Sequence, residues 1–145
     1  MRYHLPQPYR ELDHTADVGV AVEGASAAEA LARLVLALAD LLSGGGPVTG
    51  AREERIAVGA EEGLPAVAVA LLRELLYRFA TERVLPGSCE VLRVDPSGAE
   101  IGAGLAPWDP ERHREGLDIK AVTRHQARFE RDPEGRWRAQ VLFDV

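Results

Sequence analysis

A chain of 145 residues with one cysteine and a net charge of −6 at pH 7 suits one compact domain, residues 1–145, without an internal disulfide. The acidic balance argues against a protein that follows nucleic-acid phosphates with surplus cations, and it favours a metal ion or a basic partner. No apolar run is long enough for a signal peptide or a membrane span, so we expect a soluble, cytoplasmic protein without a membrane partner. The one cysteine, Cys89, is expected to act as a small residue of the hydrophobic core.

The first predicted element is a strand from Leu12 to Val22. Its even positions are nearly all apolar, and its odd positions include Asp13 and Asp17. This period of two is typical of a strand with one buried and one exposed face, and in a continuous strand the two aspartates share the exposed face. His14 falls on the buried parity, which is typical of a core histidine. Because the run is long for one strand, a bend near His14 or Thr15 is the alternative.

Two amphipathic helices are predicted next. The first follows the capping box Ser-Ala-Ala-Glu at residues 26–29, carries a stripe of leucines and ends at the Ser-Gly-Gly-Gly that begins with Ser43. A short strand is expected at residues 55–60. The second helix has Pro65 in its first turn and an apolar stripe that runs to Phe79.

Two hairpins are predicted in the second half of the chain. The Asp-Pro-Ser-Gly at 95–98 and the Asp-Pro-Glu-Gly at 132–135 both suit three-residue loops that close on a glycine. In the last hairpin this register pairs Phe129 with Ala139, His125 with Phe143 and Arg124 with Asp144. It places most apolar residues on one face, while the other face carries Lys120, Arg124, Arg128, Arg136, Arg138 and Asp144. The predicted fold is therefore α+β, with the two helices packed on a mostly antiparallel sheet in a two-layer sandwich.

A long charged connection separates these hairpins, from Leu105 to Asp118. Trp108 is expected to anchor it to the core, and residues 111–115 are expected to form one helical turn after Pro110. Loops of this size in a compact domain are often functional.

The end of the chain carries two carboxylates, one on the side chain of Asp144 and one at the terminus of Val145. Because apolar and polar residues alternate up to the last residue, we expect the strand to be fixed to its end. Together with Asp17 these groups supply three hard oxygen ligands of the kind that Ca²⁺, Mg²⁺ or Mn²⁺ prefers. Aspartates at strand ends also bind local amides and chain termini usually fray, so a purely structural role is the alternative for each carboxylate.

The only lysine, Lys120, occurs in a sequence with sixteen arginines, which hints at a site that uses a compact ammonium group. Motifs of conventional enzymes are missing from the sequence. The glycines at 44–46 follow a helix instead of opening one, and no serine stands in a nucleophile elbow. Metal-assisted hydrolysis by the aspartates stays open.

Four separated segments resemble the archease family and occur in the family's order: ELDHTADVGV at 11–20, LYRFATE at 76–82, DIKAVTRH at 118–125 and VLFDV at 141–145. The resemblance covers essentially the whole chain, and the four segments together are far more specific than any one of them. It implies a single archease-like domain with two helices packed on β-sheet structure.

The resemblance also implies a function, which is that of a protein cofactor and not of an enzyme. Archeases are accessory proteins of the GTP-dependent RtcB-type RNA ligase, and they promote guanylylation and repeated turnover of that ligase in tRNA splicing and RNA repair. RNA would be contacted only through the ligase. The family's divalent-cation ligands match Asp17, Asp144 and Val145.

Three further positions match family motifs, and we expect them to take part in activation of the partner: Asp13, His14 and Lys120. The chain departs from the family where a tyrosine is common and Arg124 stands here. Two alternatives remain, namely a chaperone-like modulator of a tRNA methyltransferase and a freestanding metal-dependent phosphohydrolase.

Overall fold

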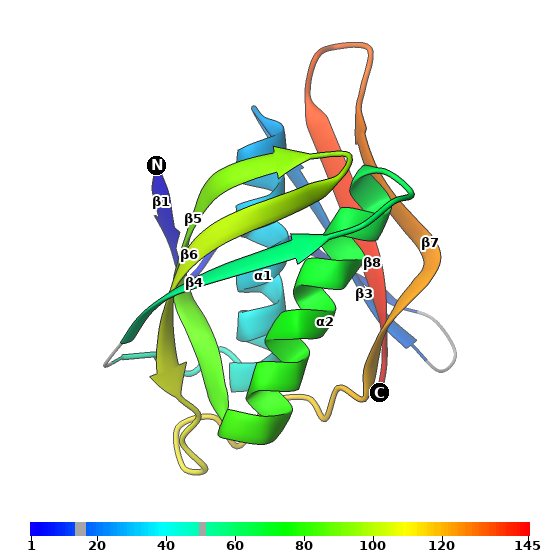
Figure 1. The fold of residues 1–145 in the computed structure, drawn as a ribbon. Helices are drawn as coiled ribbons and strands as arrows, with labels where there is room; N and C mark the ends of the chain where they lie inside the picture. Colours follow the sequence, from blue (N-terminus) through cyan, green and yellow to red (C-terminus); the bar gives the residue numbers. More distant parts are fainter. Residues whose placement is uncertain (14–16, 50–51) are drawn as a thin grey trace.

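The computed structural model describes residues 1–13, 17–49 and 52–145, which form two antiparallel four-stranded sheets and two helices (Figure 1). In spatial order, the first sheet consists of β1 (Arg2–His4), β5 (Val84–Asp95), β6 (Gly98–Pro107) and β4 (Arg52–Gly59). The second sheet consists of β2 (Arg10–Asp13), β3 (Asp17–Gly24), β8 (Trp137–Asp144) and β7 (Ala121–Arg131). The helices are α1 (Ala27–Ser43) and α2 (Leu64–Glu82).

Both helices pack against both sheets. Helix α1 contacts β5 of the first sheet and β3 and β8 of the second, while α2 contacts β4, β5 and β7 (Figure 1). From Ala30 to Leu42, every residue of α1 except Arg33 and Asp40 is buried. The α+β class is confirmed, and the structure adds that the strands are divided between two sheets with α1 at the centre of the core.

The ends of α1 follow the predicted signals. The Ser26 hydroxyl accepts the Glu29 amide at 3.0 Å, and the Glu29 carboxylate accepts the amide of Ala25, the residue before the N-cap, at 2.8 Å, which is a variant of the capping box. At the other end Gly44 takes the left-handed conformation, with φ of 64°, and its amide donates to the Asp40 carbonyl.

The capping box gives a testable prediction for stability. Ser26→Ala is expected to lower the free energy of unfolding by about 1 kcal/mol.

The amide of Ala25 holds the pKa of Glu29 below its ordinary value of 4.5. A lowered pKa in the folded state stabilises the protein above the ordinary value, and this contribution is lost as the pH falls through the folded-state pKa. Glu29→Gln should therefore lower the free energy of unfolding at neutral pH and make it decrease less as the pH falls. Urea titrations at several pH values measure this. An equally steep decrease in the variant and the unaltered chain would contradict the prediction.

The predicted strand from Leu12 to Val22 is wrong as a continuous element. Instead β2 and β3 pair antiparallel, with Leu12 opposite Gly19 and Asp13 opposite Val18. Alternation is preserved along each arm of a hairpin, so the period of two could not distinguish one long strand from two short ones. The suggested bend at His14 or Thr15 lies outside the described residues.

The two predicted hairpin loops have different outcomes. At 132–135 the prediction is confirmed, because the amide of Asp132 donates to the Arg136 carbonyl at 2.7 Å and Gly135 has a φ of 87°. At 95–98 it is wrong, since Asp95 lies directly opposite Gly98 and the loop has two residues. Gly98 is required there by a close approach, because a Cβ atom would lie 2.5 Å from the carbonyl oxygen of Val58 on β4.

A bulge in β7 changes the register of the last hairpin. Phe129 lies opposite Ala139 as predicted, but the pairing shifts between Thr123 and Arg128. Within this bulge Gln126 has a φ of 55°, and its carbonyl accepts the side-chain amide of Gln140 at 3.0 Å. The bulge reverses the parity of β7, because Val122 before it and Phe129 after it face the same side of the sheet.

The shift makes two predicted pairs wrong. Val122, not His125, lies opposite Phe143, and Ala121, not Arg124, lies opposite Asp144. His125 is accordingly exposed and does not belong to the core. Cross-strand partners share a face, so Ala121 now lies beside Asp144, at the position that the predicted register gave to Arg124.

The connection after β6 docks on the C-terminal end of α1. The amide of Leu117 donates to the Leu41 carbonyl at 2.9 Å, and the Trp108 indole donates to the Leu42 carbonyl at 3.2 Å. These bonds satisfy carbonyls that a helix end leaves without partners. Trp108 also packs edge-to-face on Phe79, at 6.2 Å between ring centroids, which confirms its anchoring role.

One buried side chain closes the same connection on itself. His113 is 2% exposed; its Nδ1 accepts the amide of Asp109 at 2.8 Å, and its Nε2 lies 2.7 Å from the Pro47 carbonyl. The His113 amide donates to the Asp109 carbonyl at 2.9 Å, so a single turn follows Pro110. The connection is therefore an ordered segment that delivers Lys120 to the start of β7.

Cys89 is fully buried in the core, and this burial raises the pKa of its thiol to about 12. Its predicted role as a core residue is confirmed.

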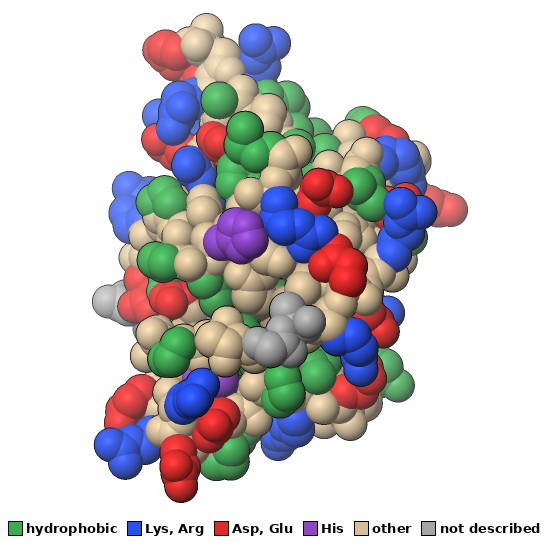
Figure 2. Space-filling model, turned by 90° about the vertical axis from the view of Figure 1, so that its left-hand side faces the viewer, with side chains coloured by type: hydrophobic (Ala, Val, Ile, Leu, Met, Phe, Trp, Pro, Cys, Tyr) green, Lys and Arg blue, Asp and Glu red, His purple; other side chains and the backbone are tan. Residues whose placement is uncertain are grey.

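The surface over the first sheet carries charges of both signs. Figure 2 shows the side on which β1 and the N-terminus lie in Figure 1, and acidic and basic side chains stand next to one another there. An ion pair also joins Arg2 of β1 to Glu53 of β4. Neither helix in the described part of the chain is long and apolar enough to cross a membrane.

Candidate functional site

The end of the chain lies beside the start of β3 (Figure 1). Asp144, the last residue of β8, is directly opposite Asp17, the first residue of β3. On its other side Asp144 lies opposite Ala121, and its carbonyl accepts the amide of Lys120 at 2.8 Å. The last strand is therefore held from both sides, which confirms that it is fixed to its end. We call the group formed by Asp17, Asp144 and the terminal carboxylate of Val145 the acidic corner.

The acidic corner concentrates negative charge. Residues directly opposite one another in an antiparallel pair have Cβ atoms about 4.5–5.5 Å apart and point to the same side, and like charges there are destabilising. Asp17 is partly exposed, while Asp144 and Val145 are exposed. Among residues 1–13, 17–49 and 52–145, no basic side chain lies within ion-pair distance of Asp17 or Asp144. A cation between these carboxylates would offset their repulsion.

The other predicted site residues, Asp13, His14 and Lys120, are not part of the acidic corner. Lys120 is exposed and joins the corner through its backbone, without an ion pair to either aspartate. Asp13 pairs with Val18, in the row next to that of Asp17 and Asp144. His14 lies outside the described residues.

The donor chemistry of the acidic corner fits a hard divalent cation. All of its candidate ligands are carboxylate oxygens, which suit Ca²⁺, Mg²⁺ or Mn²⁺. Within the described ranges no three His, Cys, Asp or Glu side chains come together at one point. The two aspartates would therefore need the terminal carboxylate and water to complete the coordination shell.

Two contacts that hold the corner in place were missed by sequence reasoning. The Nε of Arg73, on α2, donates to the Val122 carbonyl at 2.9 Å and so ties the start of β7 to the helix. The Thr123 hydroxyl accepts the amide of His125 at 3.0 Å where the bulge begins. Both contacts involve backbone groups, so no residue pattern could have marked them.

The segment 76–82 lies on the C-terminal half of α2 and contributes indirectly. Phe79 contacts Trp108, and the Arg83 guanidinium lies over both rings, 5.1 Å and 5.6 Å from their centroids. The Trp108 amide also donates to the Arg83 carbonyl at 2.8 Å. This segment therefore holds the connection that leads to Lys120.

Repulsion within the acidic corner leads to a stability prediction. In buffer freed of divalent cations, Asp17→Asn and Asp144→Asn should each raise the free energy of unfolding, by about 0.2–1 kcal/mol, because each removes a like-charge pair. Urea unfolding measures the change. The matched control is Asp118→Asn, which removes the same charge from an exposed position in the connection. A loss of stability in both corner variants would contradict the repulsion.

Comparison with known proteins identifies the family. A sequence model of the Archease protein family matches residues 9–145. A Protein archease from Pyrococcus furiosus is 33% identical over 140 residues, which cover 94% of this chain and 98% of the relative. A Protein archease from Methanopyrus kandleri is 31% identical over 142 residues, with 95% and 99% covered.

Solved structures share the fold. The solution structure of protein 1598 from Methanobacterium thermoautotrophicum superimposes with a TM-score of 0.72 at 23% identity, over 94% of this chain and 98% of that one. The crystal structure of "an archease, possible chaperone" from Thermotoga maritima gives a TM-score of 0.59 at 22% identity, over 99% of both chains. At these identities the likeness supports the fold alone, whereas the family match spans nearly the whole sequence. The chain belongs to the archease family.

Proposed function

We propose that this chain is an accessory protein that activates a GTP-dependent RNA ligase of the RtcB type, in tRNA splicing or RNA repair. The observation that carries the proposal is the acidic corner, where Asp17 lies directly opposite Asp144 at an exposed end of a sheet. These two residues, with Val145, are the positions at which the chain resembles the family's cation ligands. The partner would be the ligase, and RNA would be reached through it.

The residues of the corner have distinct parts in this proposal. Asp17, Asp144 and the terminal carboxylate of Val145 would hold a divalent cation, which supplies positive charge for phosphate groups when it is bound. The backbone bond between Lys120 and Asp144 keeps the strand end rigid, so the carboxylates are presented in a fixed arrangement. Asp13, His14 and Lys120 would contact the partner beside the corner.

Activation requires that the chain bind one state of the ligase more tightly than another. A partner shifts an equilibrium only by its differential affinity for the two states. The corner lies at an exposed end of the sheet, where a partner's active site can reach it. Binding there would favour the state of the ligase that accepts the guanylyl group.

The direct test is the accumulation of the covalent ligase–GMP intermediate from GTP, with and without this chain. We expect the chain to accelerate formation of the intermediate and to allow repeated sealing of RNA. Unchanged rates in both assays, with a complex between the two proteins present, would exclude the proposal.

A second candidate is a chaperone-like role, which is favoured by the description of the Thermotoga maritima structure as a possible chaperone. It would act through association with a tRNA methyltransferase and would not need Asp17. Stimulation of methylation by the Asp17→Ala variant, at the level of the unaltered chain, would favour this role over ligase activation.

The opposed carboxylates also suit a third candidate, a freestanding metal-dependent phosphohydrolase. Turnover of a phosphomonoester by the purified chain with Mg²⁺ or Mn²⁺ alone would favour it over a protein cofactor.

A further inference from the structure

A groove of about 460 Å³ lies along the second sheet, and residues of all four of its strands and of α1 line it. Ala21, on its floor, follows Asp17 by four residues, or about 13 Å along β3 at the usual rise of a strand. Five arginines line the groove, against two glutamates, Glu23 and Glu130. We call it the arginine groove after Arg10, Arg33, Arg128, Arg136 and Arg138. Its positive balance contrasts with the net charge of −6 of the whole chain.

One row of the sheet has an arginine at each end, Arg10 and Arg128, with Ala21 and Gln140 between them. Arg10 lies opposite Ala21, Ala21 opposite Gln140, and Gln140 opposite Arg128, so the row crosses all four strands. Within the described part of the chain neither Arg10 nor Arg128 forms an ion pair. Ala21 and Gln140 lie between these two arginines in the row, and the Gln140 side chain donates to the Gln126 carbonyl.

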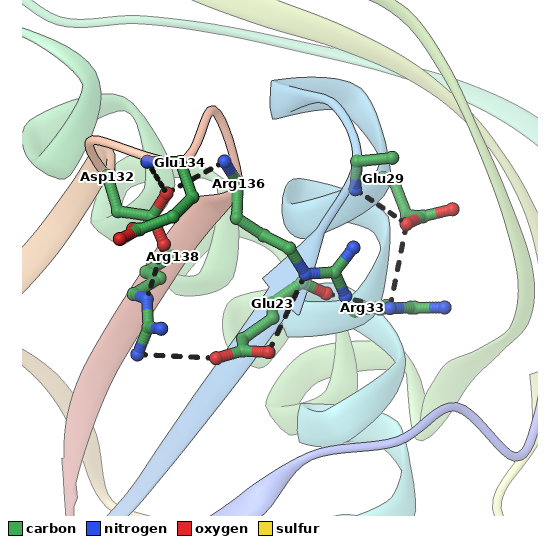
Figure 3. A network of polar contacts seen from close by, with 8 residues as sticks. Glu23, Glu29, Arg33, Asp132, Glu134, Arg136 and Arg138 are labelled. Atoms are coloured by element: carbon green, nitrogen blue, oxygen red, sulfur yellow. Dashed lines mark hydrogen bonds and ion pairs between the residues drawn. The ribbon is translucent and has the colours of Figure 1, made fainter.

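The adjacent row already contains an internal anion. Figure 3 shows the Glu23 carboxylate between two guanidinium groups, with Oε1 3.3 Å from Nη1 of Arg138 and Oε2 3.7 Å from Nε of Arg136. The Glu23 carbonyl accepts a hydrogen bond from Arg33 at 2.7 Å, which ties the edge of β3 to α1. Glu23 therefore holds the guanidinium groups of Arg136 and Arg138 at one side of the groove, and Asp132 also binds Arg138, 3.0 Å from its Nε.

The bound carboxylate limits what else can enter. A ligand with one carboxylate carries the same charge as Glu23 and would have no advantage over it in binding the guanidinium groups. A phosphate carries more charge and more acceptor oxygens for the planar guanidinium of arginine. Rows on either side also limit the length of the anion. Glu23 and Glu130 border the arginine row on one side, and Leu12, Gly19 and Leu142 border it on the other. Glu23 and Glu130 flank Arg138 in the row on one side, and Gly19 and Leu142 are buried on the other, so one or two phosphate groups fit along the row better than a long polyanion.

We propose that the arginine groove binds a small phosphate-bearing ligand, held by Arg10 and Arg128 over Ala21. Glu23 competes with this ligand for Arg136 and Arg138. The volume of the groove falls within the usual range for small-molecule sites. The proposal does not depend on the acidic corner or on the ligase.

The test is calorimetric titration with inorganic pyrophosphate in buffer freed of divalent cations, so that no cation can carry the probe to the acidic corner. We expect saturable binding at one site. Arg10→Ala and Arg128→Ala should each weaken it by about tenfold, the loss expected for removal of a hydrogen bond to a charged group. Glu23→Gln should strengthen it severalfold, because it removes the Glu23 carboxylate from Arg136 and one of two carboxylates from Arg138, which keeps its ion pair with Asp132. The matched control is Arg114→Ala, which removes the same charge from an exposed arginine outside the groove and should leave affinity unchanged.

The opposite signs expected for Glu23→Gln and the arginine variants separate a binding site from a general effect of charge. Thermal unfolding of each variant checks that the fold is retained. The proposal is overturned by an absence of saturable binding, or by an equal loss of affinity in Arg114→Ala. Single-stranded RNA that displaces pyrophosphate with an affinity rising with its length would also overturn it, in favour of a polyanion site.

Discussion

Replacing Asp17 or Asp144 by alanine is expected to reduce the stimulation of ligase guanylylation to the level seen without this chain. Each change removes one of the two side-chain carboxylates of the acidic corner, and a hard cation held by so few protein ligands loses most of its affinity when one is removed. The fold should be retained, because both residues lie at the exposed end of a sheet outside the hydrophobic core. The measurement is the initial rate of ligase–GMP formation at a saturating concentration of each variant.

The matched control for this prediction is Asp118→Ala, which removes an exposed carboxylate near the end of the connection between β6 and β7. Asp118 is exposed and lies two residues before Lys120, so it tests for a general effect of negative charge near the partner. Full stimulation by folded Asp17→Ala and Asp144→Ala proteins would show that the acidic corner is not the functional site.

The largest loss of stability is expected from Gly116→Ala. A Cβ atom at this position would lie 2.0 Å from the carbonyl oxygen of Leu42 and 3.1 Å from that of His113, and backbone atoms cannot move aside as a side chain can. The substitution should push the connection off the end of α1 and break the bond between Leu117 and Leu41. We expect the free energy of unfolding to fall by about 3 kcal/mol, at the upper end of the usual cost of overpacking.

Gly59→Ala is the control for the glycine substitution. A Cβ atom there would be 3.7 Å from the nearest atom, the carbonyl oxygen of Ser97, which is an ordinary contact. Its unfolding midpoint in urea should stay close to that of the unaltered chain, within about 0.5 kcal/mol in free energy. Equal stability of the two variants would mean that the connection does not dock on α1 as described.

Local signals in the sequence predicted the elements well. The capping box at Ser26, the glycine after Ser43 and the proline at the start of α2 each act on the backbone within one turn, so their effects can be deduced from neighbours in the chain. The loop at 132–135 belongs to the same class, because its geometry depends on the positive φ of Gly135 and on the Asp132 side chain, which accepts the amides of Glu134 and Arg136.

Features that depend on distant parts of the chain could not be predicted. Alternation could not show that β2 folds back on β3, nor that the bulge before Arg128 replaces Arg124 by Ala121 beside Asp144. The meeting of Asp17 and Asp144 was expected from the fixed strand end and from the family resemblance, but the strand pairing that produces it lies between residues far apart in sequence. The arginine groove was not expected, because the predicted hairpin placed only three of the groove's arginines, Arg128, Arg136 and Arg138, on one face, and the other two come from β2 and α1.

The central claim is that the start of β3 and the end of the chain together hold one cation. The most direct test is a titration of the ¹⁵N-labelled protein with substoichiometric Mn²⁺, which broadens the amide signals nearest to the bound ion. We expect selective broadening at Asp17 and Val18 together with residues 143–145, while the hairpin loop at 132–135 stays sharp. The claim would be contradicted if the signals of Asp17 and Val18, or those of residues 143–145, stayed sharp. It would also be contradicted if other acidic residues broadened first.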